Sequence, residues 1–226
     1  MWLLAAALWF AAASPSAQAH DPAHYYDWVS GGGLDLWPGA SPTVDAHFAE
    51  GEVNETRRES VRVGVNAWDD VAGSALTFTF PGSDNPNYPL WDRRDCSPGP
   101  ANTIHWDDSI PSSTGWDAFA YVCTDANLDI KSFGIGFDST TPFTWRSDGG
   151  NPAASELDLR SVAAHEAGHA TGGWLDGSDF GHFNDGNPDV CPVNSARQTM
   201  CASTIFGTDW GRTLAAHDKD TFADAY

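Results

Sequence analysis

Apolar and polar positions repeat along the chain with two different periods, and each period predicts a different kind of element. Val61, Val65 and Trp68 recur at spacings of four and three, which predicts a helix over residues 57–72. Residues 76–80 alternate apolar and polar side chains and are rich in β-formers, which predicts a strand. Other short stretches of the same kind predict strands over 44–49, 103–106, 118–123 and 130–137.

Two more helices are predicted in the second half of the chain. The first begins near Ser155 or Asp158, which are both good N-cap residues, and ends at Thr171 before Gly172 and Gly173. The second covers residues 213–225. Between them, the long loop of residues 173–212 needs either a function or a cross-link, because loops of this length are uncommon in compact domains. This order of elements predicts an α+β fold.

The first residues resemble a segment that is removed from the mature protein. An apolar run over residues 2–13 is followed by Ala17-Gln18-Ala19, a small-x-small pattern typical of signal-peptide cleavage. A membrane anchor or a buried helix is the alternative, but the run is shorter than the roughly 20 residues that span a bilayer. We therefore expect a signal peptide over residues 1–19, secretion, and an irregular N-terminal arm over residues 20–41.

The amino-acid composition and the net charge limit which classes of function this chain can have. The chain has 226 residues, 41% of them hydrophobic, which favours one folded domain over disorder. Asp and Glu total 31 against 11 Lys and Arg, and the net charge is −20. Such a balance disfavours nucleic acid and anionic membranes as partners, because both are bound through Lys and Arg. Solubility in salt, calcium binding and a simple solvated surface all remain open as reasons for the charge.

The four cysteines predict two disulfides, since an even number in an exported chain favours pairing. Sequence alone permits three pairings. We expect Cys96–Cys123 and Cys191–Cys201, because each pair closes a local loop.

The candidate chemistry lies in the motif His165-Glu166-Ala167-Gly168-His169. Residues four apart lie on one face of a helix, so His165 and His169 can reach one zinc ion. Zinc acidifies a bound water, and Glu166 is placed to act as its general base and then to protonate the leaving amine. Two ordinary surface histidines are the alternative. Gly168 argues against it, because glycine is costly inside a helix unless another group packs closely against it.

A catalytic zinc usually has three protein ligands. After Gly172 the next histidine is His182, and glycines between them allow the chain to turn back. Asp176 and Asp179 are rivals, because carboxylates also bind zinc. We expect His182 to be the third ligand.

These residues resemble those of the metzincin metallopeptidases, and of the matrixins especially. Residues 165–172 follow the family's H-E-x-x-H-x-x-G pattern, and Met200 in Thr-Met-Cys-Ala is similar to its Met-turn. The resemblance covers residues 42–226. It departs from the family at Leu175, where the third histidine would fall, so His182 serves only with seven inserted residues. The chain also lacks a cysteine-switch motif, and its N-terminal arm is too short for a usual propeptide.

The resemblance implies a fold and several roles. It implies a twisted mixed sheet, with the active-site helix and a C-terminal helix flanking a zinc cleft. One catalytic domain would cover residues 42–226, divided into subdomains near residue 172. Met200 would pack beneath the zinc without binding it, residues 203–212 would line the specificity pocket, and residues 134–138 would pair with an extended substrate. Structural calcium would also be compatible with the family.

We therefore expect a secreted zinc endopeptidase with His165, His169 and His182 as metal ligands and Glu166 as the catalytic residue. Its partner would be a protein or peptide substrate, with no nucleic acid and no membrane, and we expect a monomer. Two other functions remain open. One is a zinc hydrolase that acts on something other than peptides, and the other is a secreted binding protein with a non-catalytic metal site.

Overall fold

The computed structural model describes residues 36–51, 54–82, 84, 102–107, 110, 117–127, 129–140, 144–172, 191–195, 197–201 and 206–226. The predicted signal peptide and most of the N-terminal arm lie outside these residues. No helix in the described part of the chain is long and apolar enough to cross a membrane.

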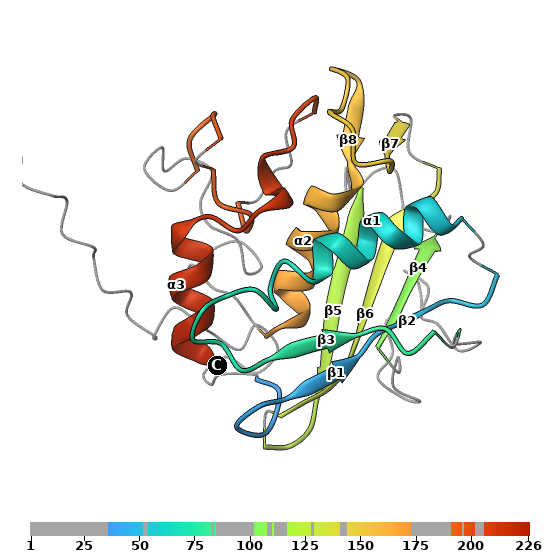
Figure 1. The fold of residues 1–226 in the computed structure, drawn as a ribbon. Helices are drawn as coiled ribbons and strands as arrows, with labels where there is room; N and C mark the ends of the chain where they lie inside the picture. The colour runs from blue at the N-terminus through green and yellow to red at the C-terminus, as the bar shows by residue number, and fades with distance from the viewer. Residues whose placement is uncertain are drawn as a thin grey trace, which may run out of the picture.

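The main sheet has four strands in the order β2-β4-β6-β5 (Figure 1). These strands are β2 (His47–Phe48), β4 (Thr103–Asp107), β6 (Ile130–Asp138) and β5 (Ala118–Thr124). The pairs β2–β4 and β4–β6 are parallel, whereas β5 runs antiparallel to β6. The predicted mixed sheet is therefore present, and β5 lies at its edge.

Two short parallel pairs accompany this sheet. The strands β1 (Thr43–Asp45) and β3 (Thr77–Thr79) pair, and so do β7 (Thr144–Arg146) and β8 (Glu156–Asp158). The strand expected over 44–49 is thus divided into β1 and β2. Neither β7 nor β8 is predicted by the sequence pattern, because their three residues are too few to show an alternation.

The first helix is shorter than its sequence pattern predicts. It is α1 (Glu55–Val65), and Asn54 caps it by accepting a hydrogen bond from the backbone N–H of Arg57 at 3.1 Å. After Val65 the chain tightens into turns with i to i+3 bonds, such as that from Trp68 N–H to the Val65 carbonyl at 3.2 Å. The predicted helix end at residue 72 is therefore wrong, although Trp68 is fully buried as the periodicity implies.

The other two helices are α2 (Leu159–Ala170) and α3 (Ala216–Ala225). Asp158, one of the two predicted starts, is the N-cap of α2, and Gly172 follows the end of this helix with a positive φ of 135°. The last helix begins three residues later than the predicted start at 213, because Thr213, which follows the 3₁₀ turn η4 (Trp210–Arg212), and Ala215 both have extended backbone conformations.

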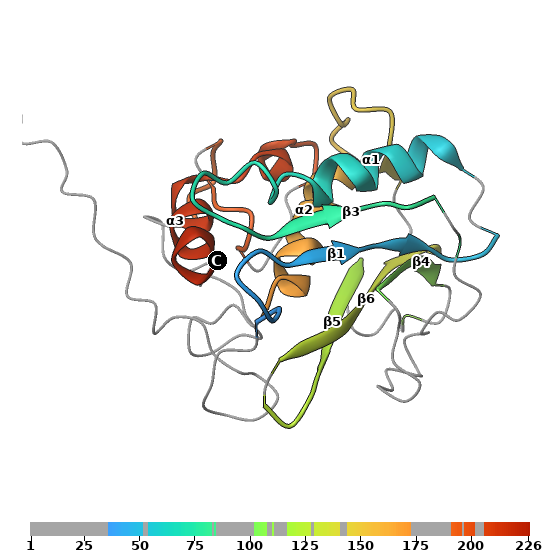
Figure 2. The same ribbon diagram turned by 60° about the horizontal axis from the view of Figure 1, so that its bottom comes forward.

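Helices α1 and α2 pack against each other, and α2 also lies against β5 and β6 (Figures 1 and 2). A side chain at Gly64 of α1 would come within 2.5 Å of the Arg160 carbonyl oxygen of α2, so glycine permits this close crossing. On the other side, Phe222 of α3 packs edge-to-face on Trp68, with ring centroids 5.0 Å apart. Helix α2, which carries the candidate motif, is therefore held between α1, the strands β5 and β6, and the turn η4.

Candidate metal centre and active site

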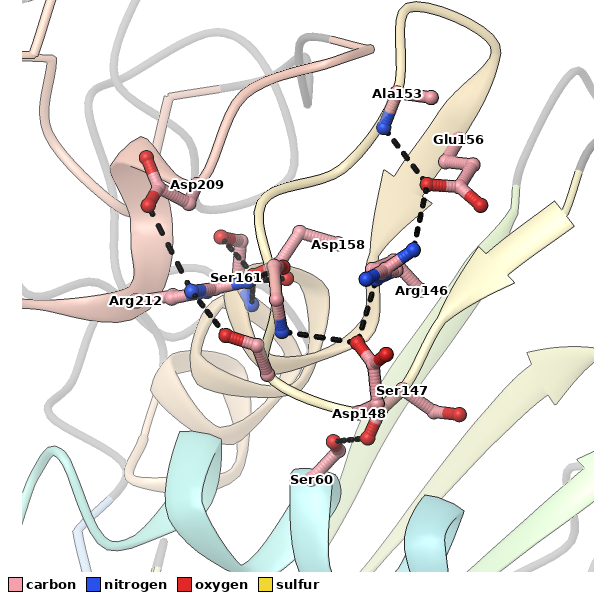
Figure 3. Close-up of polar contacts among 12 residues, drawn as sticks. Ser60, Arg146, Ser147, Asp148, Ala153, Glu156, Asp158, Ser161, Asp209 and Arg212 are labelled. Carbon is pink, nitrogen blue, oxygen red and sulfur yellow. Dashed lines mark hydrogen bonds and ion pairs between the residues drawn. The ribbon is translucent and has the colours of Figure 1, made fainter.

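An ion pair at the N-terminus of α2 holds this helix in position (Figure 3). Asp158 accepts a hydrogen bond from Ser161 N–H at 2.8 Å and two more from the Arg212 guanidinium, at 2.6 and 3.0 Å. Arg212 also donates to the carbonyl oxygens of Gly149 and Gly150, at 3.0 and 2.7 Å. This one guanidinium therefore joins η4, the turn before β8 and the start of α2, which fixes where α2 points.

Within α2, His165 is 8% exposed and its orientation is set by a backbone group. Its Nδ1 lies 2.7 Å from the carbonyl oxygen of Thr199. A carbonyl oxygen only accepts hydrogen bonds, so Nδ1 carries a proton, and in the neutral ring Nε2 is then the nitrogen with a lone pair. This is the arrangement in which histidines bind metals, with the second nitrogen hydrogen-bonded to an acceptor.

The two histidines of the motif lie side by side. Their ring centroids are 5.0 Å apart and their planes are inclined by 80°. His169 is less buried than His165, in keeping with its place near the end of α2. The spacing of four residues therefore places both imidazoles on one face of the helix, as predicted.

Between them, Gly168 is required by the packing of Met200. A side-chain carbon at Gly168 would overlap the Met200 sulfur and would come within 2.7 Å of Trp68. Met200 is fully buried, and Trp68 donates a hydrogen bond to the Ala164 carbonyl at 2.8 Å. The expectation that another group packs closely against Gly168 is confirmed, and that group is the side chain of Met200.

The segment that contains Thr199 and Met200 is held in turn by α3. Asp218, which is fully buried, accepts hydrogen bonds from the backbone N–H groups of Thr199 and Met200, at 2.7 and 3.2 Å. It also accepts one from Ala215 N–H at 3.0 Å, at the start of α3. Burial raises the pKa of Asp218 to about 6, although these hydrogen bonds act to lower it. A continuous chain of contacts thus links α3 to the imidazole of His165.

Glu166 lies in a poorly solvated environment. It is 6% exposed, and no hydrogen bond or ion pair reaches its carboxylate from the part of the chain that the structure describes. Burial raises its pKa to about 8, and the negative charge of Asp117 adds to the increase. A buried carboxylate without a cation is costly. The site therefore favours a positive charge beside it.

These donors fit a divalent metal ion. The structure brings together two imidazoles, one of them with its Nε2 lone pair set by the bond to Thr199, and a buried carboxylate that no described cation neutralises. The described residues contain no group of three His, Cys, Asp or Glu side chains that could hold a metal. His182, predicted as the third ligand, and its rivals Asp176 and Asp179 all lie outside the described residues.

The cysteines behave as predicted where they are described. Cys191 and Cys201 form a disulfide with an S–S distance of 2.02 Å, directly after Met200. Cys123 is also disulfide-bonded. Its predicted partner, Cys96, lies outside the described residues.

One prediction about the substrate is wrong. The family resemblance implies that residues 134–138 pair with an extended substrate, but they belong to β6, which pairs with β4 on one side and β5 on the other. Its backbone groups are therefore already used within the sheet. The edge strand next to α2 is β5, whose outer side pairs with no other described strand.

Sequence reasoning missed several residues that form this site. Thr199 contributes through its carbonyl group, which every residue has, so no side-chain signal exists for it. Asp218 is the third residue of α3, where an acidic side chain is typical of a helix start and gives no sign of its contacts with Thr199 and Met200. Asp117 carries no recognisable motif at all.

Comparisons with known proteins do not assign a family. No protein-family model matches the chain, and no curated protein matches it. Among solved structures, the chain resembles that of myroilysin with a TM-score of 0.42 and 15% sequence identity. The match covers 85% of this chain and 95% of that chain. A TM-score this low supports no conclusion about function, so the function must be inferred from the residues of the site.

Proposed function

We propose that this chain is a secreted zinc-dependent endopeptidase. The observation that carries the proposal is the bond between His165 Nδ1 and the Thr199 carbonyl, which sets the tautomer that binds a metal. A surface histidine on an ordinary helix would not need this buried backbone partner. Glu166, buried in the next position, adds the group that a hydrolytic site requires.

In this proposal His165 and His169 hold the zinc ion, and His182 is the third ligand. The bound zinc supplies Lewis acidity, which makes water more acidic and polarises a peptide carbonyl. Glu166 acts as the general base that takes a proton from the attacking water and then gives it to the leaving nitrogen. A positive charge beside Glu166 lowers its pKa from the value that burial alone produces, so that it is ionised as a base must be.

The edge of β5 is the proposed place for the substrate. An extended peptide can add to an exposed sheet edge through backbone hydrogen bonds. Strand β5 lies against α2, so a peptide along this edge would pass the motif. Secretion agrees with the Cys191–Cys201 disulfide, because such bonds persist in oxidising surroundings.

The test measures metal content and casein cleavage together, on wild type and four variants. We expect one zinc per chain in wild type and in Glu166→Ala, with cleavage by Glu166→Ala reduced by a factor of about 10²–10⁴. His169→Ala and His182→Ala should lose both zinc and activity. Glu50→Gln, an exposed control far along the chain, should keep both.

The other outcomes separate the alternatives. If wild type holds zinc and hydrolyses simple esters but no peptide, a different zinc hydrolase is favoured. If Glu166→Ala cleaves as fast as wild type, the metal site is not catalytic in the way proposed. If wild type holds no zinc, the proposal fails and a binding function takes its place.

A further inference from the structure

The last turn of α2 contains His169, one of the two candidate zinc ligands. The last four carbonyl groups of a helix have no partner within it, so donors must come from elsewhere. The carbonyl oxygen of Gly168 accepts a hydrogen bond from the Thr171 hydroxyl at 2.7 Å, and that of His169 accepts one from Gly172 N–H at 3.2 Å. The carbonyl groups of Ala170 and Thr171 come next, and residues far away in the sequence donate to them.

These distant donors are Trp37 and Tyr226, which together are called the clasp. The indole N–H of Trp37 donates to the Ala170 carbonyl at 2.8 Å, and the hydroxyl of Tyr226 donates to the Thr171 carbonyl. The backbone N–H of Trp37 also donates to the Tyr226 hydroxyl oxygen at 3.1 Å, which joins the two donors to each other. Burial raises the pKa of the Tyr226 phenol, so it stays protonated and able to donate. The clasp therefore forms a closed set of contacts with the end of α2.

Both residues of the clasp are anchored on other elements. Trp37 packs edge-to-face on Phe133 of β6, with ring centroids 6.4 Å apart, and the preceding Leu36 accepts a hydrogen bond at 2.9 Å from the first residue of β6. Tyr226 packs on Phe222 of α3, with ring centroids 5.2 Å apart. The end of α3 lies beside the end of α2 in both views (Figures 1 and 2). The clasp therefore ties the last turn of α2 to the main sheet and to α3.

The two candidate ligands differ in what fixes them. His165 lies one turn earlier in α2, and its ring is oriented by the Thr199 carbonyl. His169 lies in the last turn, and the last turn of a helix frays more readily than its middle. Donors that bind the final carbonyl groups oppose this fraying, because an unbound carbonyl would have to find water or another partner.

We propose, on the basis of the zinc site in the proposed function, that Trp37 and Tyr226 are positioning residues for His169. The clasp holds the last turn of α2 so that His169 and His165 reach the same zinc ion. Neither residue of the clasp binds the metal, and both act through the backbone of α2.

The first experiment measures the zinc dissociation constant of the full chain by competition with a chelator of known affinity. Trp37→Phe removes the indole N–H and keeps a ring against Phe133, whereas Tyr226→Phe removes only the hydroxyl. We expect each substitution to raise the dissociation constant about three- to tenfold. A loss of stability alone leaves this constant unchanged while the protein stays folded, because zinc binds the folded state.

Thermal unfolding shows whether each variant is folded at the temperature of the zinc titration. If one of the two does not fold, the other decides, because the two substitutions act on different carbonyl groups of α2.

Trp145→Phe is the matched control. Trp145 also donates its indole N–H to a backbone carbonyl, that of Asp138 at 3.0 Å, and also packs edge-to-face on a phenylalanine of β6, Phe137. It lies in β7, whereas the clasp lies at the end of α2. Its substitution should reduce stability to a similar extent but leave the zinc dissociation constant within about twofold of the wild-type value.

A second readout needs no zinc. In the metal-free full chain, Trp37→Phe and Tyr226→Phe should shift or broaden the imidazole NMR signals of His169. The signals of His165, which Thr199 holds, should stay near their wild-type positions. His165→Ala and His169→Ala assign the two sets of signals.

The failures of the two proposals differ. If wild type binds zinc and both clasp variants bind it as tightly, or if Trp145→Phe weakens binding as much as they do, the positioning role is overturned and the peptidase function stands. Unchanged His169 signals in both clasp variants overturn the positioning role as well. If wild type binds no zinc, the peptidase function fails, and the role of the clasp in metal binding fails with it.

Discussion

At the scale of single residues, a substitution at Gly168 tests the packing of the site directly. In an ordinary helix, replacing glycine with alanine stabilises by about 1 kcal/mol. Here the new methyl group would overlap Met200 and crowd Trp68, both fully buried. We therefore expect Gly168→Ala to lower the free energy of unfolding by about 1–3 kcal/mol, as overpacked cores do. Denaturant unfolding of the two proteins measures this change, and a gain in stability would contradict this packing.

A double-mutant cycle identifies the group responsible. Met200→Ala alone should be destabilising, because it leaves a cavity beneath α2. If the Met200 sulfur is what Gly168 accommodates, adding Gly168→Ala to Met200→Ala should cost less than it costs in wild type. Additive effects would show that Trp68 or the backbone causes the strain instead.

At this scale the sequence predicts side chains well and backbone partners poorly. The spacing of His165 and His169 correctly predicts that both rings lie on one face, and the glycine between them correctly indicates a close contact. The Thr199 carbonyl that orients His165 could not be predicted, because a backbone group has no sequence signature. The tautomer that binds metal depends on this hidden contact.

At the scale of elements, α3 acts on α2 through Asp218. We expect Asp218→Asn to lower the free energy of unfolding by about 1–3 kcal/mol, because its amide cannot accept all three backbone hydrogen bonds and leaves buried N–H groups unsatisfied. Zinc affinity should fall as well, because the Thr199 carbonyl that holds His165 loses its support. Unfolding in denaturant and zinc titration measure the two effects.

Asp220→Asn is the matched control, since it removes the same charge from the same helix at an exposed position. It should change neither quantity appreciably. If Asp218→Asn lowers stability but leaves zinc affinity at the wild-type value, then α3 supports the fold without orienting the metal site. Equal effects of the two variants would show that the charge of α3 matters and the hydrogen bonds do not.

The sequence largely predicts where the strands lie along the chain, but it does not predict which strands pair with each other. Strands β3, β4, β5 and β6 follow the predicted ranges closely because their apolar pattern is local. Which strand lies at the edge depends on pairing between distant residues, and the expectation that β6 faces a substrate is wrong for this reason. The end of α1 differs from its prediction because Trp68 continues the apolar period through turns that are no longer helical.

At the scale of the whole molecule, the positions of the acidic residues in the fold say more than their number. Asp69, Asp117 and Asp218 are spread over three parts of the fold, and burial raises the pKa of each from 3.8 to about 6. Asp69, for example, accepts a hydrogen bond from Phe78 N–H at 2.8 Å, yet desolvation outweighs that bond. The acidic residues therefore do not all lie on a solvated surface. Some of them are partly or fully buried, where ionisation destabilises the folded state.

The raised pKa values of these carboxylates determine how the stability of the fold changes with pH. A carboxyl group whose pKa is higher in the folded state binds its proton more tightly there, so folding is favoured when the group is protonated. The contribution is fully present below about pH 4 and is lost as pH rises through about 6. Asp125 and Asp148 act in the opposite direction, because hydrogen bonds lower their pKa values, but their contribution disappears only below the normal aspartate range.

We therefore expect the metal-free protein to lose stability as pH rises from about 4 to about 7, measured by denaturant unfolding in the presence of a chelator. Repulsion among the net negative charges acts in the same direction, so the series is repeated at high salt, which screens exposed charges far more than buried ones. Asp69→Asn keeps an acceptor for Phe78 N–H and should make the slope shallower, whereas Asp220→Asn should not. A slope that vanishes at high salt would assign the effect to surface repulsion, and a slope of opposite sign would contradict the buried carboxylates as its cause.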